Sequence, residues 1–108
     1  MKTLKFRGSL KESILKKEKD TTWRLFDDKD INEGDDVELI IWESGKKFAT
    51  AKIIRIKEVL FENLTIEDKM GHEKFASDKE MYETYSRYYN KEITPKDKLK
   101  IIKFKLSD

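Results

Sequence analysis

The fold of this chain is decided where a helix gives way to a strand, in the stretch Ile14-Leu15-Lys16-Lys17-Glu18-Lys19-Asp20-Thr21-Thr22-Trp23-Arg24. Apolar residues at its start and just before it recur one helical turn apart, so we expect a helix over residues 10–18. Residues 21–26 are rich in β-forming types and predict a strand. Alternation along that strand puts Thr22 and Arg24 on one face and Trp23 on the other.

The rest of the chain reads as short strands with helices between and after them. Capping-box patterns at residues 9–12 and 77–80 mark two helix starts, and Ser44-Gly45 predicts a tight hairpin. Near Ile101-Ile102 the apolar positions change side, which indicates a bulge or burial on both faces of the last strand. Further strands are expected over residues 4–6, 37–42, 47–57 and 99–106, and further helical segments over 64–70 and 78–89.

This β-α-β-β-β-α-α-β order determines the expected fold class. Hairpins join most of the strands, which argues against a parallel doubly wound sheet. We expect an α+β fold, namely a small mixed or antiparallel β-barrel of about five strands with two or three flanking helices. The 108 residues fit a single domain spanning 1–108, with no linker or repeat visible.

Composition narrows the functional classes. There are no cysteines, which removes disulfides, thiol catalysis and zinc–sulfur sites. No apolar run approaches the ~20 residues of a membrane span, so a soluble cytoplasmic protein is the default expectation. The net charge of +2 comes from 24 basic and 22 acidic residues, a balance too even to indicate nucleic-acid binding by itself. Four of the basic residues are arginines, whose planar fork suits bidentate recognition: Arg7, Arg24, Arg55 and Arg87.

The spacing Lys19-x-x-Thr22-x-Arg24 after a helix resembles the signature of ASCH domains, which are related to the PUA domains of RNA-modifying enzymes. The family pattern is Gly-x-Lys-x-x-(Glu or Thr)-x-Arg, then a loop and a Gly-Asp turn, which Gly34-Asp35 match. Residues 71–75 and the tyrosine-containing helix after them are similar to the family's second motif. The resemblance therefore spans nearly the whole chain and implies a PUA-like barrel.

One position departs from that pattern. The family usually has Gly two residues before the Lys, where a helix ends with positive φ, and this chain has Lys17.

A bacterial branch of the family, which hydrolyses N4-acetylcytidine, resembles this chain in its Lys-x-x-Thr spacing. The resemblance implies a catalytic set of Lys19, Thr22 and Glu73. Thr22 would supply the nucleophilic hydroxyl. Either Lys19 accepts its proton in a neutral form, or Glu73 takes the proton while charged Lys19 stabilises the oxyanion.

A binding function asks for less chemistry. Lys19 and Arg24 would contact phosphate or a base edge, with Lys17 as a further cation and Trp23 or a tyrosine as a stacking surface. The ordinary alternatives are a salt bridge between Lys19 and Glu73 and packing of Trp23 and Trp42 in the core. The single histidine, His72, is expected to be an exposed loop residue.

The leading hypothesis is thus a cationic cleft that binds RNA or a modified nucleoside. Hydrolysis of N4-acetylcytidine or a related acylated nucleoside is the enzyme alternative, and a protein-interaction adaptor is the third. No cofactor or metal is expected, because the acidic residues 27–30 lack the Gly and terminal Glu of a calcium loop. No membrane partner is expected, and a monomer is the default.

Overall fold

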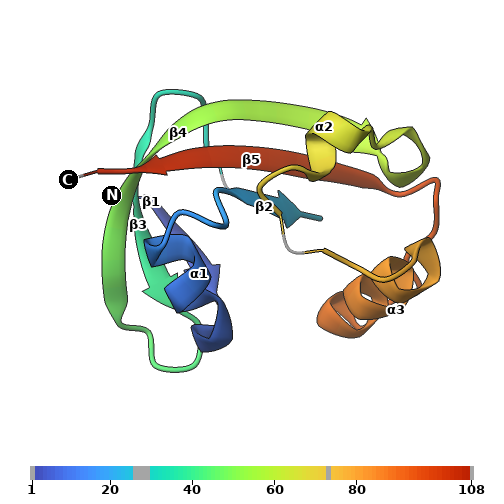
Figure 1. Cartoon of the computed structure of the whole chain (residues 1–108), viewed down its shortest axis with the longest axis horizontal. Coiled ribbons are helices and arrows are strands. Elements are labelled where there is room, and N and C mark those ends of the chain that lie inside the picture. Colours follow the sequence, from blue (N-terminus) through green and yellow to red (C-terminus); the bar gives the residue numbers. More distant parts are fainter. Residues whose placement is uncertain (1, 26–29, 73, 108) are drawn as a thin grey trace.

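The computed structural model describes residues 2–25, 30–72 and 74–107 of the chain. Five strands form one sheet in the order β1-β3-β4-β5-β2, and Figure 1 shows this sheet with short helices around it. The strands are β1 (Lys2–Phe6), β2 (Thr21–Arg24), β3 (Asp36–Ile41), β4 (Lys47–Leu60) and β5 (Lys98–Leu106). The helices are α1 (Lys11–Leu15), α2 (Ile66–Lys69) and α3 (Asp78–Tyr89), with 3₁₀ turns η1 (Gly8–Leu10) and η2 (Phe61–Asn63).

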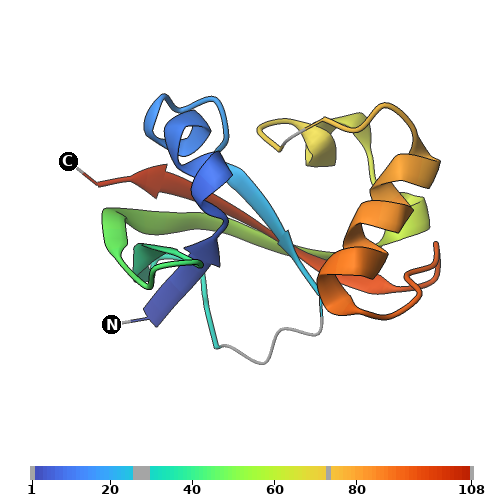
Figure 2. The same ribbon diagram turned by 90° about the horizontal axis from the view of Figure 1, so that it is seen from below.

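The sheet is mixed and strongly curved. β1 pairs with β3 in parallel, and the other neighbours pair antiparallel. The long strands β4 and β5 form the spine, and the sheet curls around them into a half-barrel (Figures 1 and 2). The predicted α+β class and the predicted order of strands and helices along the chain are therefore confirmed.

A bulge helps the spine to bend. In β4, Ile53 pairs with Phe104 and Arg55 with Lys103, so the residue between them has no partner in β5. The sequence pattern places this irregularity in the last strand, whereas the structure has it in the neighbouring one. The alternative offered by that pattern is confirmed, because Ile101 and Ile102 are both buried.

The apolar core consists of two clusters, one on each face of the sheet. Ile101 and Ile102 are neighbours on β5 and are both buried, so one belongs to each cluster. Ile102 packs with β1, β3 and Ile14 of α1, whereas Ile101 packs with residues of α3 and β2. The first cluster consists of Leu4, Phe6, Ile14, Ile31, Val37, Leu39, Ala51, Ile53, Ile102 and Phe104. The second consists of Trp23, Leu25, Phe61, Met81, Tyr85, Ile93, Leu99 and Ile101.

The first helix is shorter than expected. Residues 8–10 form the 3₁₀ turn η1, α1 ends at Leu15, and neither element has a side-chain cap, so the capping box predicted at 9–12 is wrong. Lys17 ends the helical run, because it has φ 64° and its amide donates to the Ile14 carbonyl at 3.0 Å.

The later helices begin at capped residues. Ser77 accepts a hydrogen bond from the Glu80 amide at the start of α3, as its sequence predicts. At α2, Thr65 and Asp68 form a reciprocal capping box that the sequence analysis missed. Among the described residues, no helix is both long enough and apolar enough to cross a membrane.

Candidate functional site

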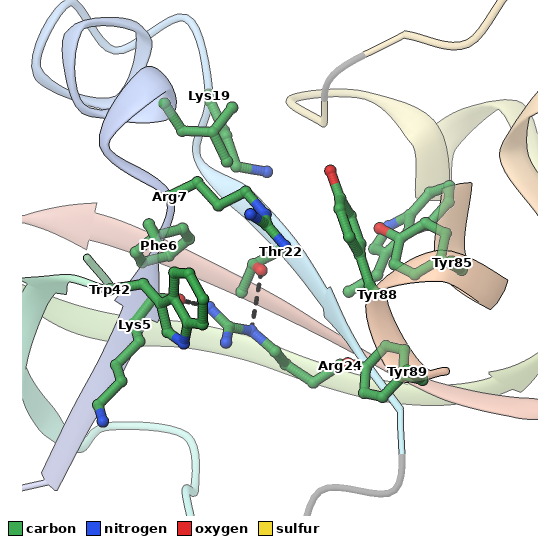
Figure 3. A pocket seen from close by; sticks show the side chains of 12 residues that line it. Lys5, Phe6, Arg7, Lys19, Thr22, Arg24, Trp42, Tyr85, Tyr88 and Tyr89 are labelled. Carbon is green, nitrogen blue, oxygen red and sulfur yellow. Dashed lines mark hydrogen bonds between the residues drawn. The ribbon is translucent and has the colours of Figure 1, made fainter. Parts of the chain in front are cut away.

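A pocket of about 280 Å³ opens between the end of β1, the strand β2 and helix α3 (Figure 3). It lies where the two core clusters meet, since Phe6 belongs to one and Trp23 and Tyr85 to the other. Its described lining residues are Lys5, Phe6, Arg7, Leu10, Lys19, Thr22, Trp23, Arg24, Trp42, Tyr85, Tyr88 and Tyr89. Four of the six site residues named in the sequence analysis, Lys19, Thr22, Trp23 and Arg24, thus line one pocket.

Lys19 reaches the pocket because the chain turns sharply after α1. The positive φ of Lys17 ends the helix, and the amides of Glu18 and Lys19 both bond to the Ser13 carbonyl. The Lys19 side chain is only 4% exposed, and its Nζ donates to the Thr21 carbonyl at 2.6 Å. A lysine buried to this degree is rare without a specific partner, so its position is built into the loop.

Thr22 and Arg24 lie on the same face of β2, as strand alternation predicts. Arg24 Nε donates to Thr22 Oγ1 at 3.1 Å, and Arg24 Nη2 donates to the Lys5 carbonyl at 2.7 Å. The guanidinium also lies 4.9 Å from the Phe6 ring centroid. These contacts fix the guanidinium beside the hydroxyl (Figure 3) and leave the Thr22 proton able to be donated to a ligand.

Trp23 lies on the other face of β2 and packs in the second core cluster. The prediction that it packs in the core is confirmed. Its indole stacks on the His72 ring at 4.0 Å between centroids, with an interplanar angle of 13°. Among the described residues, its Nε1 is the one buried side-chain nitrogen or oxygen without a hydrogen-bond partner. Such a buried donor carries a desolvation cost that a ligand or a water acceptor would relieve.

The prediction that His72 is exposed is wrong. His72 is buried and its Nε2 lies 2.9 Å from the Tyr85 hydroxyl. The reason is the docking of the preceding turn: Gly71, at φ 78°, accepts at its carbonyl the amides of Asp20 and Thr21. This contact brings residues 71–72 under β2, so the histidine ring enters the core.

The rim of the pocket carries residues that sequence reasoning did not assign to it. Trp42, expected in the core, is 58% exposed and lies at the pocket mouth beside Arg7 and Tyr88. β1 and β3 run parallel with Phe6 opposite Ile41, so the residues that follow them, Arg7 and Trp42, emerge side by side. The pairing of β1 with β3 joins segments far apart in the sequence. The one local signal is the apolar run ending at Trp42, which indicates that a strand ends at this residue.

Comparison with known proteins rests on structure alone. Neither a family model nor a curated protein sequence matches the chain. An ASCH domain from Lactobacillus crispatus JV V101 has a TM-score of 0.73 and 13% identity, over 97% of this chain and 79% of that one. The hypothetical protein PH0355 has a TM-score of 0.74 and 22% identity, over 99% and 100% of the two chains. ASCH from Zymomonas mobilis has a TM-score of 0.66 and 13% identity, over 98% of this chain and 66% of that one.

The chain has the ASCH-domain fold. ASCH structures match 97–98% of this chain, which supports the resemblance drawn from the sequence, and at these identities the likeness concerns the fold. The Gly-Asp turn of the ASCH pattern is present, since Gly34 has φ 88° and Asp35 directly precedes β3.

The remaining ASCH-type positions lie outside this pocket or outside the described residues. Lys17 lines a separate pocket of about 280 Å³ between α1 and the end of β5. Lys19 lines both pockets and separates them. Lys17 itself has φ 64°, the left-handed conformation that suits the glycine of the ASCH pattern. Glu73 lies outside the described residues, and its predicted catalytic role stays a prediction.

Proposed function

We propose that this ASCH-type domain binds RNA or a modified nucleoside in the pocket between β1, β2 and α3. The observation that carries the proposal is the arrangement of Arg24, Thr22 and Lys19, a guanidinium, a hydroxyl and an ammonium on one wall. A volume of about 280 Å³ is near the lower end of the ~300–1,000 Å³ usual for small-ligand pockets.

Each group has a place in such recognition. Arginine and lysine donate to phosphate oxygens or to acceptors on a base edge, and a threonine hydroxyl both donates and accepts. Arg24 is pre-organised, because two of its nitrogens already bond within the protein. The tyrosines of α3 supply flat apolar surface on the opposite wall (Figure 3), the usual partner of an unstacked base.

A titration with a short single-stranded cytidine RNA tests this function. Arg24→Ala is expected to weaken binding about tenfold or more, because a fixed charge-assisted donor is lost. Arg55→Ala is the matched control, since Arg55 lies on β4 outside this pocket and forms an exposed ion pair with Glu67 at 3.9 Å. Equal effects of the two substitutions, or no binding by the wild-type protein, contradict the proposal.

A second candidate function is hydrolysis of N4-acetylcytidine or a related acylated nucleoside. The hydrogen bond from Arg24 Nε to Thr22 Oγ1 favours it, since a cation donating to that oxygen stabilises the charge it gains on losing its proton. Thr22 Oγ1 would attack the acetyl carbonyl, its proton passing to neutral Lys19 or to Glu73. The exocyclic amine would leave with a proton as cytidine, and water would release acetate from the threonine ester.

Incubation with N4-acetylcytidine, followed by detection of cytidine, tests the hydrolase. Thr22→Ser keeps a hydroxyl and is expected to retain turnover, whereas Thr22→Val is expected to abolish it while the protein stays folded. Turnover that survives in Thr22→Val rules out Thr22 as the nucleophile. Absence of turnover in the wild-type protein at high enzyme concentration leaves binding as the function of the pocket.

A further inference from the structure

Arg7 sits between two exposed aromatic rings at the mouth of the pocket. Its Cζ lies 5.1 Å from the centroid of Trp42 and 4.8 Å from that of Tyr88. The two rings come from opposite sides of the site, Trp42 from the end of β3 and Tyr88 from α3, and Figure 3 shows Arg7 reaching between them. Within the described residues, no hydrogen bond or ion pair holds the Arg7 guanidinium, so the rings are its main contacts.

Both rings are unusually exposed for their size. Trp42 is 58% exposed and Tyr88 is 48% exposed, although the chain has a core to receive aromatic residues. The main chain at Trp42 is anchored, because its amide donates to the Phe6 carbonyl at 2.7 Å, and the Tyr88 ring packs edge-on against Tyr85 at 5.7 Å between centroids. Solvent-facing aromatic rings offer π-surfaces on which a planar base can stack.

The gap between the rings has the dimensions of a stacking site. Aromatic rings pack with centroids 4.5–7 Å apart, and the guanidinium lies within that range of both Trp42 and Tyr88. A planar base centred where the Arg7 guanidinium lies would therefore contact both rings. The exposed cation displaced from the gap would remain next to the phosphate of that nucleotide, as would Lys5 beside it.

We infer that Trp42 and Tyr88 form a second subsite, which stacks one base of single-stranded RNA next to the nucleotide held at Arg24. The inference rests on the proposed function and narrows it, because a ligand that also reaches Trp42 and Tyr88 needs a second base. In the free protein Arg7 occupies the subsite, and on binding it moves to the phosphate between the two nucleotides. The ligand is then an oligonucleotide of at least two residues.

The test compares two probes, cytidine 5′-monophosphate and a five-nucleotide cytidine RNA. The wild-type protein is expected to bind the RNA at least tenfold more tightly than the monophosphate. Trp42→Ala is expected to remove about tenfold of the affinity for the RNA, the usual scale for one base–aromatic stack, and to weaken binding of the monophosphate much less. Ile66→Ala is the control, since Ile66 is an exposed apolar residue outside the pocket.

Fluorescence provides a second readout that a loss of folding does not imitate. The chain has two tryptophans, Trp23 in the core and Trp42 at the surface. RNA is expected to quench the emission of the wild-type protein more than cytidine 5′-monophosphate does, and Trp42→Phe is expected to lose that extra quenching while keeping most of the affinity.

Equal affinity for the two probes, unchanged by Trp42→Ala, overturns the second subsite and leaves the proposed function standing. Failure of the wild-type protein to bind either probe overturns both.

Discussion

Lys17 shows how a single residue shapes the site at a cost in stability. Its φ of 64° is a left-handed conformation, which costs a residue with a Cβ roughly 1–2 kcal/mol. The conformation is required, because it turns the chain from α1 toward Lys19 and β2.

Lys17→Gly is therefore expected to raise the free energy of unfolding by about 1 kcal/mol, since relief of strain outweighs the added freedom of the unfolded chain. Urea unfolding of the two proteins measures the change. Asn90→Gly is the matched control: Asn90 caps α3 at φ 50°, but asparagine tolerates this region, so its gain should be smaller. A loss of stability in Lys17→Gly would show that the lysine side chain contributes more than its backbone costs.

At this scale the sequence was informative about one wall of the pocket. Lys19, Thr22 and Arg24 are neighbours along the chain, so the helix end and the alternation of one strand sufficed to place them together. The sequence does not predict that Arg7 and Trp42 lie together at the pocket, because the parallel pairing of β1 with β3 brings them together. His72 was misplaced for a related reason, since a turn rich in polar residues gives no sign that Gly71 docks on β2.

At the scale of elements, the packing beneath β2 depends on a helix of four residues, α2. α2 is too short to be stable alone, and its capping box is reinforced by Lys57 of β4, whose Nζ lies 2.9 and 3.1 Å from the Asp68 oxygens. Thr65 donates its amide to the same carboxylate at 3.1 Å. This clamp holds the start of the segment that carries Gly71 and His72 to β2.

The Asp68 clamp predicts a pH dependence of stability. Burial alone would raise the pKa of Asp68, but hydrogen bonds from Lys57 and Thr65 outweigh it and hold that pKa below its ordinary value. A carboxyl with a lowered folded-state pKa stabilises the protein above the ordinary aspartate pKa, and this contribution is lost as pH falls through the folded-state pKa. Asp68→Asn should cost about 1–3 kcal/mol at pH 7, and the difference from wild type should shrink in acid.

Thermal unfolding at pH 7 and near pH 3 measures both effects. Asp36→Asn is the control, because the 3.4 Å pair of Asp36 with Lys52 is exposed at both ends and exposed pairs contribute little. A gap between wild type and Asp68→Asn that stays constant with pH would mean that the charge of Asp68 is unimportant.

The local sequence pattern predicts which helices and strands are present and their order, but it does not predict where each of them ends. The predicted strands and helices all occur within the described residues, because each is marked by its own periodicity and turn residues. The first helix ends at Leu15 because the chain turns back toward β2. The bulge in β4 accommodates the curvature of the whole sheet. Both the helix end and the bulge depend on contacts between distant parts of the chain, so the local sequence pattern does not predict them.

For the molecule as a whole, acidic and basic residues are nearly balanced. The net charge of +2 arises from 46 ionised residues, and many lysines pair with carboxylates at the surface. Four cations nevertheless line the described part of the pocket: Lys5, Arg7, Lys19 and Arg24. Binding of RNA should thus draw on these few cations and very little on the rest of the surface.

The salt dependence of RNA binding measures that number. For single strands, the logarithm of the affinity falls with the logarithm of the salt concentration by about 0.7 per neutralised phosphate. Four pocket cations then predict a slope no steeper than about −3. Arg24→Ala should make the slope shallower by about 0.7, while Arg55→Ala should leave it unchanged. A slope twice as steep would mean that RNA lies across the lysine-rich surface, and that the pocket between β1, β2 and α3 recognises something else.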